Sequence, residues 1–511
     1  MTDLNSYESE LKADPDLAGP ASREIERVVK SEVKALVNDV VAEQGELYEM
    51  KGHRMSFNAA AIAALYIREN DVCWVVEYAS YFFWDGAVWK PRTEDEIING
   101  IRLWWVQRSK TFAEVLGLTD GMPLLADSME QTVARRIRGM VSKRDVVTSG
   151  MTVNGVDIMP LADGDLWLEE DARFEKPSPR VFVRGRLGVA WNRLQSQSSD
   201  LEIEQELFFP ALGGDSEMVE ALWDLVARCV LPRGYFPAIN YLGGEPGAGK
   251  TTILNFILAL AGEAACKELD FGELAGSAFA KGFFAEGRVL YADDIGSDAL
   301  SGKGAHKLKS LTGGGVMQGR LPFAREKVNF RGDFQILLSS NKDQRIALDD
   351  DFGAWERRFC VWKFKAYERK KTIEHYHSYL LEKEGYWIIQ RILKAVKRLR
   401  ERQEMRLPIW RPSAMMRQVD AMLNASDTIV EFLSEYLVAD SGYVVTKSAL
   451  RDGYNGYARA HGLSVMSRNE FSSKADAAME RVFGLKLRKD VPDDTGKHQR
   501  GWHGLKWIKT P

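Results

Sequence analysis

The sequence predicts an α/β protein with a largely parallel central sheet, and two observations support this fold class. Between residues 206 and 365, short apolar runs alternate with helical patterns, which is typical of parallel strands joined by helical crossovers. One run leads directly into a glycine-rich loop and an apolar helix, as in phosphate-binding domains. The predicted strands cover residues 238–242, 288–292, 334–340 and 359–364.

The length and charge of the chain limit the classes of protein that remain. Its 511 residues are enough for about three or four domains. With 69 Lys+Arg against 73 Asp+Glu, the net charge of -4 excludes a uniformly basic nucleic-acid-binding protein. The charge is segregated, however, because residues 363–511 hold 28 basic and 18 acidic side chains, and such asymmetry suggests an anionic partner.

Residues 1–205 are predicted to form an N-terminal α+β module. The pair Asp85-Gly86, which lies between aromatic runs, predicts a hairpin with a type I′ turn. Asp163 and Asp165 form a D-x-D pattern inside a glycine-rich polar segment, and we interpret them as turn residues. Helices are expected at residues 22–48, 94–116 and 127–143, and short strands with a turn at Asn154-Gly155 within residues 150–192.

Two further segments follow the central domain of residues 206–365. Residues 366–424 are predicted to be helical and basic, with breaks at Pro408 and Pro412. Residues 425–511 are predicted to form a separate small domain in which three helices precede two strands. The two strands are expected at about residues 482–489 and 501–508, around a polar turn.

A phosphate-binding loop is predicted between the first central strand and its helix. The segment matches G-x-x-x-x-G-K-[ST] at every fixed position, and a glycine-rich turn without a ligand is the weaker alternative. The glycines let N–H groups turn inward around phosphate oxygens. Lys250 is expected to reach the β- and γ-phosphates of ATP, and the Thr251 hydroxyl to bind Mg²⁺. The nucleotide-binding candidates are Gly244, Glu245, Pro246, Gly247, Ala248, Gly249, Lys250, Thr251 and Thr252.

Polar residues at the ends of two later strands complete the predicted catalytic set. Asp293 is expected to hold Mg²⁺ through water, and Asp294 to orient and deprotonate the attacking water. Asn341 is expected to contact that water or the γ-phosphate. In isolation these residues would be typical of solvated strand ends, and the preceding phosphate loop favours the catalytic interpretation.

Arg357 and Arg358 come directly before the last central strand. An arginine in this position can reach the nucleotide of a neighbouring subunit and stabilise charge in the transition state. Arg358 is preferred to Arg357 because it directly adjoins the apolar run, and a surface ion pair with Glu356 or Asp351 is the alternative.

A basic segment interrupts the acidic middle of the chain. Residues 301–330 carry six basic side chains against one acidic side chain, and residues 316–330 are predicted to form a hairpin. Such charge suits contacts with nucleic-acid phosphates, although a solvated charged hairpin is the alternative. The DNA-binding candidates are Lys309, Arg320, Phe323, Arg325 and Lys327.

The cysteines and the chain start bear on location. The four cysteines are isolated in the sequence: Cys73, Cys229, Cys266 and Cys360. We therefore expect no zinc site, and we expect the cysteines to be reduced thiols. No apolar run is long enough to span a membrane, and the acidic N-terminus does not resemble a secretory signal. We therefore expect a cytoplasmic protein with no membrane partner.

The order of these motifs resembles that of superfamily III helicases of the phage, plasmid and large-DNA-virus primase-helicase group. The resemblance rests on the phosphate loop, the acid pair, residues 309–314, Asn341 and Arg358, all within about 115 residues. Residues 83–89 resemble the N-terminal module that accompanies this group, and residues 427–509 resemble its C-terminal winged helix. No primase half is recognisable, and the Asp163–Asp165 pattern does not supply one.

The resemblance implies an AAA+-like ATPase core that acts as a replicative DNA helicase of a mobile element in a bacterial host cell. It implies a ring, as a rule a hexamer, that binds ATP and Mg²⁺ between subunits and moves 3′→5′ on single-stranded or forked DNA. A separate primase or polymerase would be a further partner, and the N-terminal module could assist oligomerisation. The alternative function is an ATPase that acts as a replication initiator or loader without processive unwinding.

Overall fold

The central sheet of the computed structural model contains all four predicted strands. The structure describes residues 20–119, 121–143, 151–191, 201–276, 282, 284–285, 287–297, 299–301, 305–320, 328–346, 352–368, 373–461, 465–493 and 495–509. The chain divides into two compact units. The first unit comprises residues 1–186 and 319–329, and the second comprises residues 187–318 and 330–511.

The first unit combines helices with small sheets, as predicted. Its helices are α2 (Pro20–Gln44), α3 (Ala59–Glu69), α4 (Glu94–Val115) and α5 (Asp127–Met140). Its strands are β1 (Tyr48–Lys51), β2 (Arg54–Phe57), β3 (Val72–Val75), β4 (Ser80–Trp84), β5 (Trp89–Arg92), β6 (Ser142–Lys143), β7 (Thr152–Val153), β8 (Val156–Leu161), β9 (Gly164–Trp167) and β10 (Arg173–Glu175). They form sheets in the orders β1-β2, β5-β4-β3-β6 and β10-β9-β8-β7.

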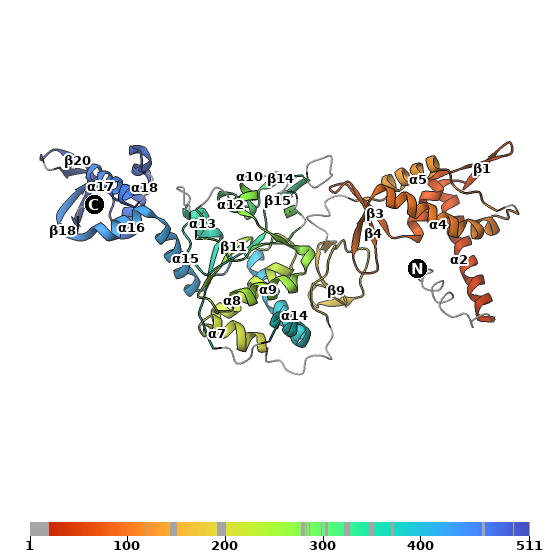
Figure 1. Ribbon diagram of the computed structural model, residues 1–511, viewed down its shortest axis with the longest axis horizontal. Helices are drawn as coiled ribbons and strands as arrows, with labels where there is room; N and C mark the ends of the chain where they lie inside the picture. Colours follow the sequence, from red (N-terminus) through yellow and green to blue (C-terminus); the bar gives the residue numbers. More distant parts are fainter. Residues whose placement is uncertain are drawn as a thin grey trace. The chain divides into compact units, whose positions relative to one another are not determined.

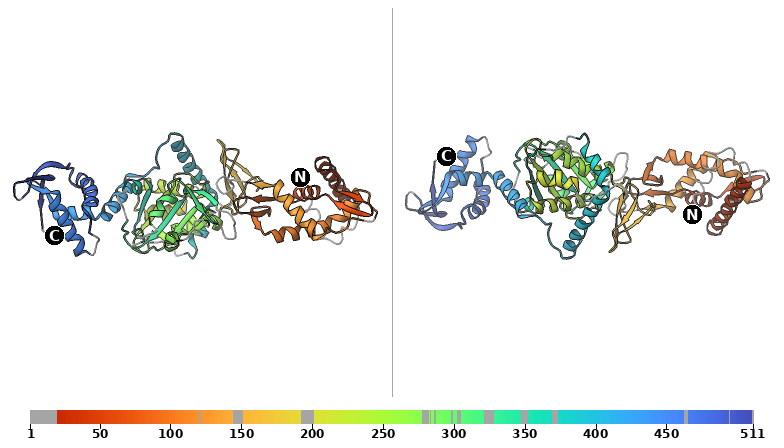
Figure 2. Two further views of the ribbon diagram at one scale, coloured as in Figure 1. Left: turned by 90° about the horizontal axis from the view of Figure 1, so that it is seen from above. Right: turned by 90° about the horizontal axis from the view of Figure 1, so that it is seen from below.

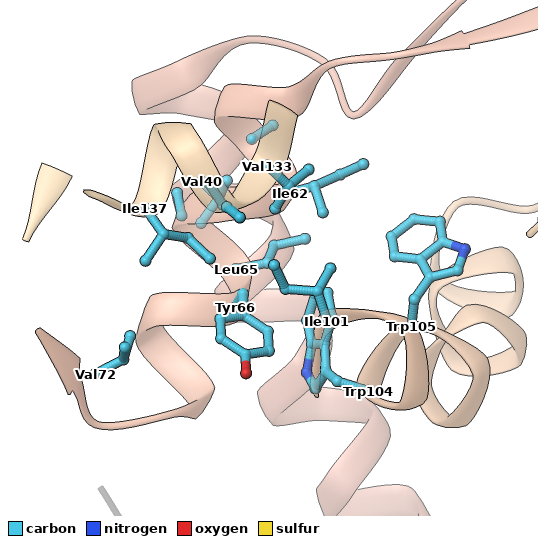
Figure 3. Packing of buried hydrophobic residues seen from close by; sticks show 14 of the residues in the cluster. Val40, Ile62, Leu65, Tyr66, Val72, Ile101, Trp104, Trp105, Val133 and Ile137 are labelled. Atoms are coloured by element: carbon cyan, nitrogen blue, oxygen red, sulfur yellow. The ribbon is translucent and has the colours of Figure 1, made fainter. Parts of the chain in front are cut away.

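A core rich in aromatic residues holds the helices of the first unit together. Figure 3 shows Leu65, Ile101 and Val133 packed between Tyr66 and the neighbouring helices. The Tyr66 ring meets the Trp104 ring edge-on at 5.2 Å. Burial of these large side chains supplies the hydrophobic stabilisation of this unit.

The turns of the first unit confirm one prediction and correct another. Asn154 and Gly155 have φ of 51° and 80°, as a type I′ turn between β7 and β8 requires. The hairpin at Asp85-Gly86 forms, but the type I′ turn predicted there is wrong, because Trp84 pairs with Trp89 and leaves a four-residue loop. The Asp85 carboxylate accepts the N–H groups of Ala87 and Val88, at 2.9 and 2.8 Å, and closes this loop.

The D-x-D pattern belongs to the β8–β9 hairpin. Asp163 lies in its turn, as predicted, whereas Asp165 lies in β9 and is fully buried. The Asp165 carboxylate accepts a hydrogen bond from the Arg186 guanidinium at 2.8 Å. Asp165 therefore stabilises the fold by a buried ion pair and does not contribute to the turn.

The second unit is built on a five-stranded parallel sheet. Strand β11 lies between β16 and β17, and every pairing in the sheet is parallel. Figure 2 shows these strands in green, running side by side. The short first strand, β12, was not predicted, because its Lys267 and Glu268 give no apolar run. In sheet order the strands are β12 (Cys266–Glu268), β13 (Val289–Ala292), β16 (Gln335–Ser340), β11 (Ala238–Gly244) and β17 (Phe359–Phe364).

Helices α8, α9 and α14 pack against one another, and α9 also packs on strands β11 and β16 (Figure 1). The Phe208 ring lies 5.2 Å from the Trp223 ring of α8 and 5.9 Å from the Phe256 ring of α9, so aromatic contacts join them. The helices and helical turns around the sheet are η3 (Ile203–Phe208), α7 (Phe209–Ala211), α8 (Ser216–Val230), α9 (Lys250–Ala261), η4 (Glu263–Ala265), α10 (Phe271–Gly276), α12 (Ala305–Leu311), α13 (Phe352–Arg358), α14 (Tyr376–Glu404) and α15 (Ser413–Ser426).

The basic helix α14 uses part of its charge inside the second unit. Arg398 donates to Asp224 of α8 at 2.6 Å and lies 2.8 Å from Glu220. Arg391 lies 2.6 Å from the same Glu220. These two arginines of the basic segment therefore bind acidic side chains of the protein itself.

Strands β14 (Val316–Gly319) and β15 (Val328–Arg331) form a two-stranded sheet at the place of the predicted basic hairpin. Backbone hydrogen bonds of 2.8 and 2.9 Å join Gly314, Gly315 and Gly332 at its base. Lys309 precedes the hairpin and lies on helix α12.

The last part of the chain forms a small helical domain with a sheet. Its predicted helices are present. It has three strands where two were predicted, since the sequence did not indicate the half-exposed strand β18. The strand predicted at residues 482–489 starts later, since α18 continues to Phe483. The elements are α16 (Thr428–Tyr436), β18 (Leu437–Thr446), α17 (Lys447–Ala460), α18 (Arg468–Phe483), β19 (Arg488–Pro492) and β20 (His498–Trp507). Across the described part of the chain, no helix has the length and apolarity that crossing a membrane requires.

The Arg398–Asp224 pair gives a stability prediction. Changing Arg398 to Ala leaves the Asp224 carboxylate, only 7% exposed, without its main cation. We expect a loss of about 2 kcal/mol in the free energy of unfolding, measured by denaturant titration, because an unpaired buried charge is costly. Lys394→Ala, on an exposed position of the same helix, is the control and should cost less than about 0.5 kcal/mol. Equal effects of the two changes would contradict the structural role of the pair.

Candidate nucleotide-binding site

The phosphate loop connects the carboxyl end of β11 to the first residue of α9. Gly244 ends the strand, and a Cβ there would lie 2.2 Å from the Phe364 carbonyl oxygen of β17. Gly247 and Gly249 have φ of 80° and 84°, in the left-handed region that favours glycine. The three glycines therefore meet backbone requirements of the loop, and the N-terminus of α9 faces its end.

The Lys250 side chain is hydrogen-bonded to the backbone of the phosphate loop. Its side chain donates hydrogen bonds to the carbonyl oxygens of Gly244 at 2.8 Å and Glu245 at 2.7 Å. The residue is 5% exposed, and burial lowers the pKa of its ammonium group, whereas Asp293 and Asp294 oppose this shift. An ammonium held in the concave side of such a loop suits the phosphates of a nucleotide.

The acid pair and Asn341 meet at the same edge of the sheet. Asp293 and Asp294 follow β13, Asn341 follows β16, and these strands are neighbours. The Asn341 amide donates to the Asp294 carboxylate at 3.4 Å. Since β16 also neighbours β11, three adjacent strands bring the predicted loop, acids and amide to one edge, where ligands of open parallel sheets bind.

Asp294 has an uncommon backbone conformation. Asp294 has φ of 47°, an uncommon value for a residue with a side chain, and its N–H donates to the Asp293 carboxylate at 3.0 Å. Both carboxylates are exposed. Backbone strain of this kind clusters at functional sites, because the surrounding structure must maintain it.

The donor set fits a magnesium ion shared with phosphates. Thr251 is exposed at the start of α9, and Asp293 is exposed beyond β13. Among the described residues, no group of three His, Cys, Asp or Glu side chains could hold a metal by itself. Mg²⁺ in nucleotide sites is bound by one or two protein oxygens together with phosphates and water, which matches Thr251 and Asp293.

A cavity of about 900 Å³ extends from the loop, and sequence reasoning missed most of its lining. It reaches from Gly244 and Pro246 to Lys365, Arg417 and Gln418. Lys365 follows strand β17, so the strand-end pattern that revealed the acids could have revealed it. Arg417 lies on α15, far away in the sequence, and no local pattern marks it. The volume is sufficient for a nucleotide beyond its phosphates.

Arg357 and Arg358 lie at the amino ends of the strands, whereas the loop, the acids and the amide lie at the carboxyl ends. We call these two sides the amino edge and the carboxyl edge of the sheet. Phe359, the next residue, pairs with Ile239 at the amino end of β11, whereas Phe364 pairs with Gly244. Five strand residues therefore separate the arginines from the loop of their own chain, about 17 Å along the strand. The structure does not bring them into the site of the same chain.

The two arginines differ in their surroundings. Arg357 is exposed, whereas Arg358 is half-buried and donates to the Ala354 carbonyl oxygen at 3.0 Å. Neither forms an ion pair with Glu356, and Asp351 lies outside the described residues. Arg357 is therefore the freer of the two, although the sequence favoured Arg358.

The DNA-binding candidates do not all lie on the hairpin. Lys309 is on α12, before the hairpin, with its ammonium group 5.8 Å from the centre of the Trp355 ring. Arg320 follows β14 and is exposed. Phe323, Arg325 and Lys327 lie outside the described residues.

Comparison with known proteins gives similar structures but no related sequences. No family model matches the chain, and no curated protein matches it. An A-form apo structure of the NrS-1 C terminal region is similar, with a TM-score of 0.42 and 12% identity, over 86% of this chain and 98% of that one. A second apo structure of the same region has a TM-score of 0.43 and 11% identity, over 87% and 99% of the two chains.

The cavity lining gives a binding prediction. Arg417 is exposed at the cavity wall and has no ion-pair partner among the described residues. We expect Arg417→Ala to raise the Kd for ATP roughly ten-fold, because a charge-assisted contact with the nucleotide is lost. Arg459→Ala, at an exposed position away from the cavity, should leave the Kd unchanged. Titration calorimetry measures both, and equal Kd values for the two variants would remove Arg417 from the site.

Proposed function

We propose that the protein is an ATP-dependent DNA helicase that forms a ring, a hexamer as a rule, and translocates 3′→5′ on single-stranded DNA during replication of a mobile element. The observation that carries this proposal is the division of catalytic groups between the two edges of one sheet. Lys250, Asp294 and Asn341 lie at the carboxyl edge, and Arg357 and Arg358 lie at the amino edge.

The carboxyl edge supports hydrolysis of a nucleoside triphosphate. The loop N–H groups and Lys250 would hold the phosphates, and Thr251 and Asp293 would hold Mg²⁺, which neutralises charge on the transferred phosphoryl group. Asp294 would accept the proton of the attacking water while the Asn341 amide fixes the position of that carboxylate. Most of the catalytic effect in such sites comes from positioning and charge neutralisation, and these residues supply both.

The amino edge supports a shared site. A nucleotide bound at Lys250 is beyond the reach of Arg357 and Arg358 of the same chain. A second copy that presents its amino edge to this carboxyl edge would supply an arginine. Head-to-tail contacts of this kind generate rings when the rotation closes, which supports the ring expected from the resemblance to superfamily III helicases.

The hairpin and the C-terminal domain supply candidate DNA contacts. The presence of strands β14 and β15 supports a basic hairpin that contacts single-stranded DNA. The helix–strand–helix–helix–strand–strand order of residues 428–507 supports the winged helix. In that domain the side chains of Lys489, Lys497 and Arg500, on or beside the β19–β20 turn, form no ion pair with described residues. Most of its other cations are paired, as in Lys447–Asp476, Arg481–Asp427 and Lys509–Glu435.

An initiator or loader that hydrolyses ATP without unwinding is the second candidate function. It shares the carboxyl-edge chemistry and needs no DNA-gripping hairpin. The basic segment at residues 301–330 therefore favours the helicase.

The first test concerns hydrolysis. Asp294→Asn should lower kcat for ATP at least 100-fold, because the carboxylate that accepts the proton is lost, and should leave the Kd for ATP within about two-fold. Asp420→Asn, an exposed change on α15, is the control. An Asp294→Asn protein that hydrolyses ATP at the wild-type rate would refute the role of Asp294.

The second test concerns sharing of sites between subunits. Lys250→Ala is expected to lower ATPase activity at least 100-fold when present in all subunits, and so is one of the two variants Arg357→Ala and Arg358→Ala. Mixing that arginine variant with Lys250→Ala protein should restore part of the activity, because some interfaces then contain an intact arginine and an intact lysine. No rescue at any mixing ratio would count against a shared site.

The third test concerns unwinding. Forked DNA with a 3′ tail should be unwound in an ATP-dependent strand-displacement assay, and forked DNA with only a 5′ tail should not. Particle images of the same sample report the ring symmetry. ATP hydrolysis without displacement of either substrate would favour the initiator or loader.

A further inference from the structure

The first unit contains a cavity that the proposed ATPase does not use. It has a volume of about 330 Å³ and opens between α3, β4 and α4. Its aromatic lining consists of Tyr66, Phe83 and Trp104. A cavity of this size and composition is at the small end of ligand pockets in proteins.

The hydroxyl group of Tyr66 belongs to a side chain that lines this cavity. Tyr66 as a whole is 2% exposed. Figure 3 shows the hydroxyl pointing away from Leu65 and from the aliphatic core. Burial raises the pKa of Tyr66 well above its ordinary value, so the group stays neutral and can donate. The buried oxygen without a hydrogen-bond partner in this lining is Oε1 of Glu69, and such a group suggests a ligand.

A glycine inside helix α4 keeps the cavity open. Gly100 lies in the middle of the helix, where glycine is less favourable than alanine. Its φ is not in the left-handed region, so the backbone does not require it. A Cβ at Gly100 would lie 3.0 Å from the Tyr66 hydroxyl oxygen. Alanine at this position would therefore occupy the space in front of that hydroxyl.

The charged groups of the cavity compensate one another. Glu69, with a side chain 5% exposed, accepts from Arg108 and from the Trp104 indole, each at 2.8 Å. Its second oxygen has no hydrogen-bond partner among the described residues. At the rim, Arg92 lies 3.4 Å from Glu96. The cavity therefore offers aromatic surface and hydrogen-bonding groups without a net charge.

We propose that this cavity binds a single unpaired nucleobase. A base is neutral and planar, has a face that stacks on aromatic rings, and has an edge with N–H donors and ring acceptors. The Tyr66 hydroxyl and the Glu69 carboxylate would contact that edge, and Phe83 and Trp104 would contact the ring. The site lies in the first unit and is independent of the nucleotide site at Lys250. The base belongs either to a single-stranded nucleic acid or to a free nucleoside, and the test separates these sources.

The test uses the full-length protein and two labelled single strands of about 12 nucleotides, oligodeoxyadenylate and an abasic strand of equal length. Fluorescence anisotropy measures both Kd values. Gly100→Ala should weaken binding of oligodeoxyadenylate roughly five-fold and leave binding of the abasic strand unchanged, because only base contacts are blocked. Gly139→Ala is the matched control, since this glycine also lies in a helix and its Cβ would meet nothing within 4 Å. Tyr66→Phe removes only the hydroxyl and should weaken oligodeoxyadenylate in the same direction.

The outcomes separate this site from the proposed function. ATPase activity without DNA should be the same in Gly100→Ala and wild-type protein. A loss of this activity would indicate that Gly100→Ala damages the protein elsewhere, and binding of oligodeoxyadenylate by Tyr66→Phe would then decide whether the cavity binds a base. Competition by free deoxyadenosine would assign the site to nucleosides, and its absence would assign the site to bases in a strand. Wild-type protein that binds neither oligodeoxyadenylate nor deoxyadenosine, or equal responses of the two strands to both changes, would overturn the proposal.

Discussion

The close approach of strands β11 and β17 is the constraint on which the candidate site depends. Gly244 lies so near the Phe364 carbonyl oxygen that no side chain fits between them. The tight contact lets the sheet stay hydrogen-bonded up to the last residue before the phosphate loop. The loop therefore starts from a fixed point, and the acid pair and Asn341 gather around it because their strands are in parallel register with β11.

Local patterns were sufficient to predict this part of the molecule. A buried parallel strand appears in the sequence as an apolar run, and its polar end residue marks the carboxyl edge, so Asp294 and Asn341 could be placed without coordinates. Side chains that arrive from distant elements leave no such mark, and Arg417 reaches the cavity from α15 for that reason. Strands β12 and β18 were missed because they are short or half-exposed, and such strands lack a continuous apolar run. The turn at Asp85 was misjudged because an aspartate that accepts two N–H groups closes a longer loop as well as a two-residue one.

The charge distribution has a different meaning in the structure from its meaning in the sequence. The basic excess after residue 363 suggested an anionic partner. Arg391 and Arg398 account for part of it by binding Glu220 and Asp224, which belong to the acidic middle of the chain. Charge separated along the sequence is thus partly recombined within the fold, and the cations around the β19–β20 turn remain for an external partner.

Strand β17 connects the cavity beside the phosphate loop to the two arginines that precede the strand. Its first residue follows Arg358, and Lys363 near its other end lines the cavity beside the phosphate loop. All six residues of β17 pair with β11, so the separation of the two ends of the strand is fixed by the sheet. Under the proposed function, an occupant of the cavity and an arginine about 17 Å away would therefore be joined by a single strand, and a movement at one end of that strand would reach the other.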